Sequence, residues 1–235
     1  MRRFFVEEIS DKVVIEGEEF RHAVSVLRIK EGEEILLCDG KGKEWLARVD
    51  LIDKKQLCAS ALTEVENQCE PKNKLTLICG YLKGDKTELV VQKAVELGAY
   101  EIVVFSSEFS SAYMNENKLS RLQKVALEAC KQCGRAYVPK VIYCDKFSKA
   151  IDYGTMADNK LFACEFANKN SVDFKKLNSS TAIVVGSEGG FSKEEYEYSL
   201  SKGYETVFLG KRILRAETAC IALTAIIMQS LGEMQ

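Results

Sequence analysis

Two glycine-rich segments near the C-terminus carry the residues best suited to chemistry. The first is Gly186–Phe191 (GSEGGF) and the second is Gly210–Thr218 (GKRILRAET). Three glycines within five residues allow the backbone to take positive φ and to approach a ligand closely. In the second segment Ile213 and Leu214 lie between charged residues, where they could form an apolar slot for a flat ring. The alternative interpretation is two tight glycine turns with a structural ion pair.

Other catalytic signatures are missing from the sequence. The first apolar strand of the C-terminal region is followed by GYLKGDK, which lacks the G-x-G-x-x-G of dinucleotide-binding folds, and no G-x-x-x-x-G-K-[ST] phosphate loop occurs. No G-x-S-x-G elbow occurs, and the single histidine, His22, lies far from the glycine-rich segments. The nine cysteines are scattered and only Cys130 and Cys133 are close together, so we expect no metal site and no disulfide scaffold.

Basic residues are concentrated in one segment of a chain whose formal net charge is −2. Residues 118–140 carry six Lys and Arg against Glu128 alone. This patch fits a polyanion site and fits a solvated helix face about equally well, and the sequence leaves both interpretations open.

The first 70 residues have the pattern of a small β-barrel. Short apolar runs alternate with glycine turns, and one segment, 20–27, has helical spacing. The expected strands are 12–16, 33–38, 43–50 and 56–62. Residues 64–74 are polar and hold one of the two prolines, which indicates a linker.

From residue 74 to residue 235 strand and helix patterns alternate. The expected strands are 75–80, 101–105, 138–143, 161–164, 182–186 and 206–209. The expected helices are 85–97, 116–133, 147–153, 192–201 and 218–231, with capping boxes at Asp85/Glu88 and Ser192/Glu195. Strands that are apolar on both faces indicate a mostly parallel sheet covered by helices. Ligands bind beyond the carboxyl ends of such strands, where both glycine-rich segments fall.

At these segments the sequence becomes similar to a known family. GSEGGF followed by LGKRILRAETA resembles the C-terminal signature of the small-subunit ribosomal RNA uridine-N3 methyltransferases, the RsmE family. Further matches lie at Arg21-His22, Val26-Leu27-Arg28, Lys83-x-x-Lys86, the helix VQKAVELGA, and the run from Arg121 to Arg135 followed by Pro139. Two positions depart from the family pattern. Ser187 replaces a proline, and Ser107-Glu108-Phe109-Ser110 lacks the arginine of Ser-Glu-Arg-Ser.

The resemblance implies an α/β protein with an N-terminal PUA-like small β-barrel over 1–70 and a C-terminal SPOUT-type α/β domain over 74–235, threaded as a trefoil knot. It implies S-adenosylmethionine as the cofactor and no metal. The cofactor-binding residues would be Cys164, Glu165, Gly186, Glu188, Gly189, Gly190, Leu209, Gly210, Ile213, Leu214 and Arg215. The RNA-binding residues would be Arg21, His22, Arg28, Lys83, Arg121, Lys124 and Arg135.

The implied reaction is methylation of N3 of a specific uridine in 16S ribosomal RNA. Uridine N3 must lose a proton, so a positioned base would accelerate the transfer. Glu165, Glu188 and Glu217 are the available carboxylates, and Arg135 or Arg215 could stabilise the negative charge that develops on the uridine oxygen. The sequence does not choose among the carboxylates, and Arg135, Arg215 and Glu217 are the candidate catalytic residues. The alternatives are a related methyltransferase acting on another RNA, a non-catalytic RNA-binding assembly protein and a nucleotide-binding metabolic enzyme.

The partners implied are ribosomal RNA within the assembled small subunit and a second copy of the chain. Ten of the thirteen residues of Ala219–Leu231 are apolar, so this helix needs protein against a second face. We expect Ile226 and Ile227 to lie on that outer face. The helix is too short to span a membrane, and the N-terminus lacks the apolar core of a signal peptide, so we expect a cytoplasmic protein.

Overall fold

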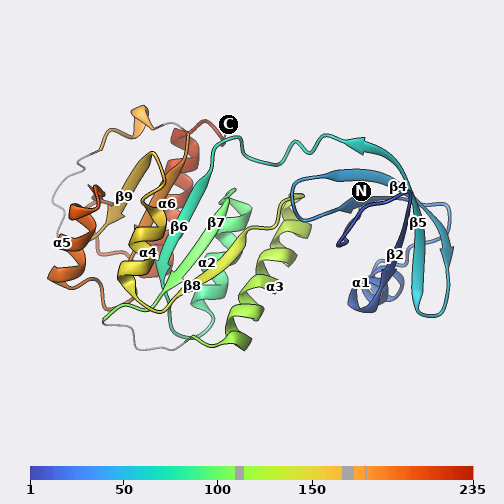
Figure 1. The fold of residues 1–235 in the computed structure, drawn as a ribbon, viewed down its shortest axis with the longest axis horizontal. Coiled ribbons are helices and arrows are strands. Elements are labelled where there is room, and N and C mark those ends of the chain that lie inside the picture. The colour runs from blue at the N-terminus through green and yellow to red at the C-terminus, as the bar shows by residue number, and fades with distance from the viewer. Residues whose placement is uncertain (109–113, 166–171, 178, 235) are drawn as a thin grey trace. The chain divides into compact units, whose positions relative to one another are not determined.

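The computed structural model describes residues 1–108, 114–165, 172–177 and 179–234, which form two compact units (Figure 1). The first unit comprises Met1–Glu70 together with Cys130–Val138. The second unit comprises Pro71–Ala129 together with Pro139–Gln235. The chain therefore enters each unit twice.

The first unit is built on a five-stranded mixed sheet with the order β1–β3–β4–β5–β2. The strands are β1 (Arg3–Phe5), β2 (Lys12–Glu16), β3 (Glu34–Cys38), β4 (Glu44–Ile52) and β5 (Gln56–Val65). In β2, Val13 and Ile15 are buried while their neighbours are exposed, which is the period of two that places one face on the core. The small β fold expected here is confirmed. The pattern does not predict β1, because three residues are too few to show a period.

A short helical segment follows β2. α1 (Gly17–Arg21) continues directly into η1, a turn of π-helix over His22–Val26. The single helix expected over 20–27 thus starts earlier and changes its winding at His22. Phe20 and Ala23 anchor the segment by packing into the core of the sheet.

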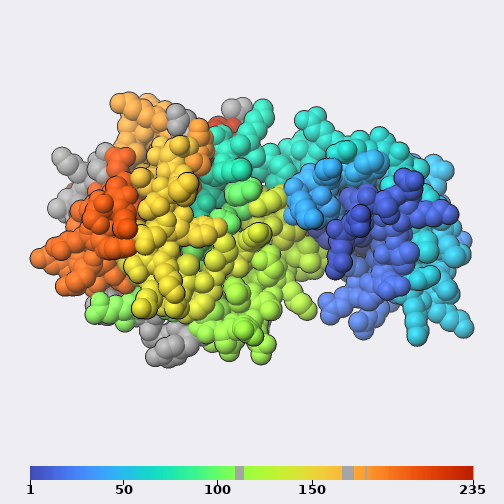
Figure 2. All heavy atoms as spheres, viewed as in Figure 1, coloured from blue at the N-terminus to red at the C-terminus, as the bar shows by residue number. Residues whose placement is uncertain are grey.

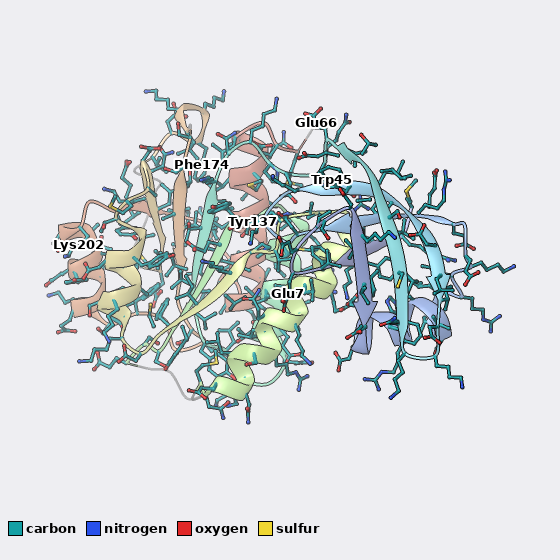
Figure 3. All side chains as sticks on the ribbon, turned by 45° about the vertical axis from the view of Figure 1, so that its right-hand side comes forward. Glu7, Trp45, Glu66, Tyr137, Phe174 and Lys202 are labelled. Carbon is teal, nitrogen blue, oxygen red and sulfur yellow. The ribbon has the colours of Figure 1, made fainter. Side chains whose placement is uncertain are left out.

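The segment Cys130–Val138 joins the first unit through polar contacts with its loops. Tyr137, labelled in Figure 3, forms β-bridges with Gly40 and Lys41, and the Val138 N–H donates to the Gly40 carbonyl at 3.0 Å. The Asn67 side chain donates to the Gly134 carbonyl at 3.0 Å. These bonds satisfy backbone groups that a connecting segment would otherwise leave to water.

The second unit is built on a six-stranded sheet with the order β11–β9–β10–β6–β7–β8, and every described pair of strands is parallel. The strands are β6 (Leu75–Gly80), β7 (Glu101–Phe105), β8 (Lys140–Cys144), β9 (Asn159–Ala163), β10 (Thr181–Val185) and β11 (Glu205–Val207). This confirms the expected mostly parallel sheet, with strand ends shifted by one or two residues. The trefoil knot stays a prediction.

Helices cover both faces of this sheet. They are α2 (Lys86–Glu96), α3 (Glu116–Cys133), α4 (Phe147–Gly154), α5 (Lys193–Ser201) and α6 (Ala216–Ser230), with a 3₁₀ turn η2 (Phe174–Lys176). α6 packs against α2, β6 and β10, whereas α4 packs against β6, β7, β8 and α5. Figure 1 accordingly draws α4 in front of the strands and α2 and α6 behind them, and Figure 2 shows yellow α4 beside orange α5.

The two expected capping boxes have different outcomes. At α5 the Ser192 hydroxyl accepts from the Glu195 N–H at 3.2 Å, and the Glu195 carboxylate accepts from the Ser192 N–H at 3.0 Å, so this box is confirmed. At α2 the Asp85 side chain makes no capping bond, so this box is wrong. Its expected partner, Glu88, instead pairs with Arg121 on α3, at 2.8 Å.

Candidate functional site

The segments that carry the candidate residues leave four neighbouring strands at one edge of the sheet. β11, β9, β10 and β6 are adjacent in this order and parallel, so the loops after them begin side by side. These loops are 208–215, 164–165, 186–192 and 81–85. The structure thus brings together the three segments that the sequence assigns to a cofactor, and it adds the loop with Lys83. This carboxyl edge is where parallel sheets bind ligands.

The Gly186–Phe191 loop is held by an aromatic anchor at its end. Phe191 is buried, and its ring centroid lies 4.3 Å from that of Phe162 and 5.7 Å from that of Phe147. A bridge between Ser187 and Gly190 closes the turn. Of the three glycines only Gly190 has positive φ, at 72°, so the expectation fails for Gly186 and Gly189. A Cβ at Gly190 would stand 2.5 Å from Glu165 Oε1, but this oxygen ends an exposed, flexible side chain that can move away, so the positive φ is what favours glycine there.

The same loop passes very close to the end of β6. A Cβ built on Gly80 would lie 2.5 Å from the Ser187 nitrogen and 2.9 Å from its Cα, both of them backbone atoms. β6 is flanked by β10 and β7, so the strand is fixed from both sides. Gly80 therefore sets how deeply the loop can sit over the sheet. The sequence analysis missed this residue, although a glycine at the end of an apolar strand signals a close backbone approach.

Ser187 has a partner that a proline would not have. Its hydroxyl lies 3.0 Å from the Ser107 hydroxyl, and both residues are buried. The substitution of the family's proline is therefore accompanied by a hydrogen bond to the loop after β7. Phe109 and Ser110, where the family pattern also differs, lie outside the described residues.

A lysine of α2 links two of the three candidate carboxylates. Lys86 Nζ donates to Glu188 Oε1 at 3.0 Å and lies 3.9 Å from Glu217 Oε2. The Lys83 N–H also donates to Glu188 Oε1, at 3.3 Å. Burial opposes the ionisation of Glu188, but the hydrogen bonds from Lys86 and from backbone N–H groups outweigh it and lower the pKa of this carboxyl. Lys86 belongs to a matched motif, but its acidic partners are distant in sequence, so its place in the site becomes visible only in the fold.

Glu217 differs from Glu188 in having acceptor capacity to spare. Its side chain is only 14% exposed, and its Oε2 atom is buried without a hydrogen-bond donor among the described residues. A buried acceptor without a donor is costly, and in a native protein it points to a missing ligand or water. Glu217 lies in the first turn of α6, at the same edge of the sheet as the glycine loop.

The second glycine-rich loop presents its side chains differently from the expected slot. Gly210 has φ of 93°, and Leu209 and Leu214 are half-buried. Ile213, however, is 99% exposed, so it does not line an apolar slot in this chain. Arg215 is exposed at the start of α6, and no ion pair joins it to Glu217 among the residues described.

Arg135 is part of the structure of the first unit. It is 2% exposed, and its Nη2 and Nε atoms each lie 3.1 Å from Glu70 Oε2. Glu70 Oε1 accepts from the backbone N–H groups of Ala136 and Tyr137, at 2.8 Å each. Arg135 belongs to a different unit from Arg215 and Glu217, and its guanidinium is committed to a buried ion pair. The structure therefore gives Arg135 a structural role, and its expected catalytic and RNA-binding roles stay predictions.

The other basic candidates are more accessible. The Arg121 side chain is largely exposed although it pairs with Glu88, and Lys83 and Lys124 are exposed. In the first unit Arg21 and Arg28 are exposed and His22 is half-buried. Arg28 has φ of 53°, which is uncommon for a residue other than glycine. Arg28 follows the π-helical turn closely, and both features are frequent at functional sites.

No group of metal-binding side chains occurs among the described residues. Cys130 is buried, and burial raises its pKa to about 12, which does not suit a redox-active thiol. No described helix is both long enough and apolar enough to cross a membrane.

The candidate site is built from carboxylates, a lysine and glycine backbone. This arrangement is suited to a ligand with hydrogen-bond donors and positive charge.

Comparison with families of known proteins matches both units. Residues 69–228 match a model described as an RNA methyltransferase domain, and residues 15–62 match one described as an RNA methyltransferase PUA domain. Ribosomal RNA small subunit methyltransferase E of Mesomycoplasma hyopneumoniae is 32% identical over 95% of this chain and 97% of its own length. The protein of the same name from Bacillus subtilis is 31% identical over 98% of this chain and 97% of its own.

Two solved structures have the same fold along nearly the whole chain. Ribosomal RNA small subunit methyltransferase E of Neisseria gonorrhoeae, bound to S-adenosyl methionine, superposes with a TM-score of 0.89 at 32% identity and covers 98% of each chain. A putative methyltransferase from Legionella pneumophila, in complex with the same cofactor, gives a TM-score of 0.87 at 26% identity and covers 97% of each chain.

Proposed function

Since this chain belongs to the ribosomal RNA small subunit methyltransferase E family, we propose that it transfers a methyl group from S-adenosylmethionine to N3 of a uridine in the RNA of the small ribosomal subunit. The observation that carries the assignment of roles is the buried Oε2 of Glu217, which lies 3.9 Å from Lys86 Nζ and accepts no hydrogen bond from a described residue. This oxygen is available to accept a proton from the substrate.

The residues present fit S-adenosylmethionine. Its ammonium and ribose hydroxyls are hydrogen-bond donors, and Glu165 and Glu188 are acceptors at the edge where the cofactor segments meet. Gly190 and Gly210 both have positive φ, a conformation that favours glycine, and Gly190 lies close to the Glu165 carboxylate. These two glycines leave backbone N–H and C=O groups free of side chains, as close contact with a ligand requires.

In the proposed reaction Glu217 accepts the proton of uridine N3. Bound S-adenosylmethionine supplies an electrophilic methyl group whose leaving group is a neutral thioether. N3 forms the new bond to carbon as the carbon–sulfur bond breaks, and the N3 proton goes to Glu217 Oε2. Glu217 is preferred over Glu188 because Glu188 already accepts from Lys86 and from the Lys83 N–H.

Lys86 and Arg215 have supporting roles in this proposal. Lys86 ties the glycine loop to the start of α6 by facing Glu188 and Glu217 together, which fixes the base relative to the cofactor loop. Arg215 is exposed and forms no ion pair with another described residue. In this proposal it stabilises the negative charge that develops on the uridine oxygens. Positioning of this kind supplies much of the acceleration in a bimolecular transfer.

The first test is binding of S-adenosylhomocysteine by calorimetry, followed by methyl transfer to small ribosomal subunits from a strain that lacks the enzyme. Primer extension locates the product, because a methyl group on N3 blocks base pairing. A stop at one uridine supports the proposal. Methylation of a different RNA, or no binding of the cofactor product, would contradict it.

The second test separates catalysis from binding. Glu217→Gln keeps the shape of the side chain but removes the base, so kcat should fall by about 10²- to 10⁴-fold while cofactor affinity changes little. Glu194→Gln, an exposed residue of α5, is the matched control and should retain full activity. Equal rates for both variants would exclude Glu217 as the base.

The chain is proposed to act as a cytoplasmic homodimer on the assembled small subunit. On α6, Ile226 is 38% exposed and Ala222 and Ala225 are half-buried, while the opposite side of the helix packs on the sheet and α2. This apolar strip supports an interface with a second copy. Ile227 is fully buried within the chain, so its expected place on the outer face is wrong.

A further inference from the structure

Ile213 is an exposed apolar side chain with cations on both sides, in the loop that follows β11 at the carboxyl edge of the sheet. Ile213 is 99% exposed, the highest value among the large apolar side chains that the structure describes. Lys211, Arg212 and Arg215 surround it in sequence, are exposed, and form no ion pair with a described residue. Leaving an isoleucine in water forgoes the stabilisation that burial of its side chain would bring. A single exposed apolar residue needs no explanation by itself. What distinguishes Ile213 is the pair of flanking cations and the loop that carries it.

The setting is a loop that is held at both ends. Gly210, with φ of 93°, begins the turn, and α6 begins at Ala216, which is buried. Leu214, next to Ile213, is half-buried, so the loop directs one of two consecutive apolar side chains inward and the other outward. Glu217, the proposed base, lies four residues after Ile213. The exposed side chain therefore projects from the segment that leads directly into the reacting site.

The charge around Ile213 favours a polyanion as its partner. The chain as a whole carries a formal net charge of −2, yet Lys211 and Arg212 put two cations next to the apolar side chain, and neither forms an ion pair within the described part of the chain. Lys and Arg bind phosphate groups, and apolar side chains next to them insert between or stack against bases in nucleic-acid complexes. A membrane would satisfy the cations, but one isoleucine buries too little apolar area to anchor a protein there. An acidic protein would satisfy the cations alone.

We propose that Lys211, Arg212 and Ile213 form a wedge that binds the substrate RNA beside the target uridine. This rests on the proposed function, because N3 lies on the base-pairing edge of uridine and is accessible only when the base is unpaired and turned out of its stack. Ile213 packs against the base face that this movement uncovers. Lys211 and Arg212 bind the phosphates on either side, which holds the backbone open.

The test compares Ile213→Ala with Met156→Ala, a control on a side chain of the same unit that is 89% exposed. Both side chains are exposed, so both variants should fold. With small ribosomal subunits from a strain that lacks the enzyme, Ile213→Ala should lower kcat/KM by about 10- to 100-fold, the range for loss of one buried aliphatic side chain. Met156→Ala should stay within twofold of the unchanged protein. Affinity for S-adenosylhomocysteine should be unchanged in both.

A second variant tests the phosphate contacts. Lys211→Ala with Arg212→Ala should weaken binding of the subunits and reduce the log–log salt slope by about one to two units. Equal kcat/KM for Ile213→Ala and Met156→Ala would overturn the wedge. So would loss of cofactor affinity in Ile213→Ala, which would make Ile213 a wall of the cofactor site, or a change in its sedimentation, which would place a second copy over it. A failure of the proposed function itself is distinguishable, because the unchanged protein would then not methylate the subunits.

Discussion

Replacing Gly80 by alanine tests whether the glycine loop over β6 is a rigid part of the cofactor site. The added Cβ would lie 2.5 Å from the Ser187 nitrogen, whereas ordinary contact begins near 3.4 Å. Something must therefore move by about 0.9 Å, the difference between these two distances. β6 is held between β10 and β7, so the loop and not the strand should yield.

The expected cost follows from the size of this movement. Overpacking of a well-packed region costs about 1–3 kcal/mol. The free protein relieves the clash by letting the loop rise, and cofactor binding must reverse that movement. Affinity for S-adenosylhomocysteine should therefore fall by about 5- to 150-fold, the same free energy expressed as a ratio of dissociation constants. Calorimetry measures this affinity, and thermal unfolding shows whether the fold itself has suffered.

A double variant identifies the atoms responsible. Ser187→Gly removes the Ser187 Cβ, which is 2.9 Å from the added methyl group, but it leaves the closer backbone nitrogen in place. Gly80→Ala with Ser187→Gly should therefore bind no better than Gly80→Ala, and Ser187→Gly alone serves as the control. Affinity within twofold of the unchanged protein in Gly80→Ala would refute the reasoning. Full rescue by the second substitution would show that the side chain, and not the backbone, sets the approach.

Three further outcomes are expected. Arg135→Ala should lower the free energy of unfolding in urea by roughly 3 kcal/mol, because it leaves a largely buried carboxylate without its cation, and an unchanged midpoint would contradict the structural role. Ile226→Glu should give a folded monomer in sedimentation, and a dimer would exclude the α6 face as the interface between two copies. Ile227→Glu changes a fully buried position and should unfold the second unit. Burial raises the pKa of Cys38 from 9.0 to about 12, so at pH 8 a thiol reagent should modify it about a thousandfold more slowly than an unperturbed thiol. Since this folded-state pKa lies above the unfolded value, the contribution of the thiol to stability should be complete below about pH 9 and should be lost as the pH rises toward 12, which urea titrations across this range would show.

Patterns that depend on local sequence predicted much of the second unit. β6 and β7 were expected with the same bounds that the structure shows, because a continuous apolar run between breaks has few other interpretations. The capping box at Ser192 also followed from local spacing. The box at Asp85 failed because Glu88 pairs with Arg121, a residue of another helix. Local spacing cannot show a competitor that arrives through the fold.

The candidate site shows the same division between local and long-range information. The glycine segments were visible as motifs, and their common edge followed from the expected parallel sheet. The sequence did not predict which carboxylate is the base. That choice depends on which carboxylates already accept hydrogen bonds from Lys86 and from backbone N–H groups. Arg135 shows that residue type does not reveal burial. The resemblance implies an RNA contact for its guanidinium, yet Arg135 is buried in the first unit and paired with Glu70.

The return of the chain to the first unit has a consequence for the order in which the protein is made. The ribosome synthesises Glu44 and Glu70 early. The residues that bond to Glu70, and the Gly134 carbonyl that shares Asn67 with Glu44, belong to the later segment Cys130–Val138. The N-terminal unit therefore stays unfinished on the ribosome until much of the second unit has also been translated. It is not a module that can be cut off at residue 70 or exchanged for another, because its last piece is encoded in the middle of its neighbour.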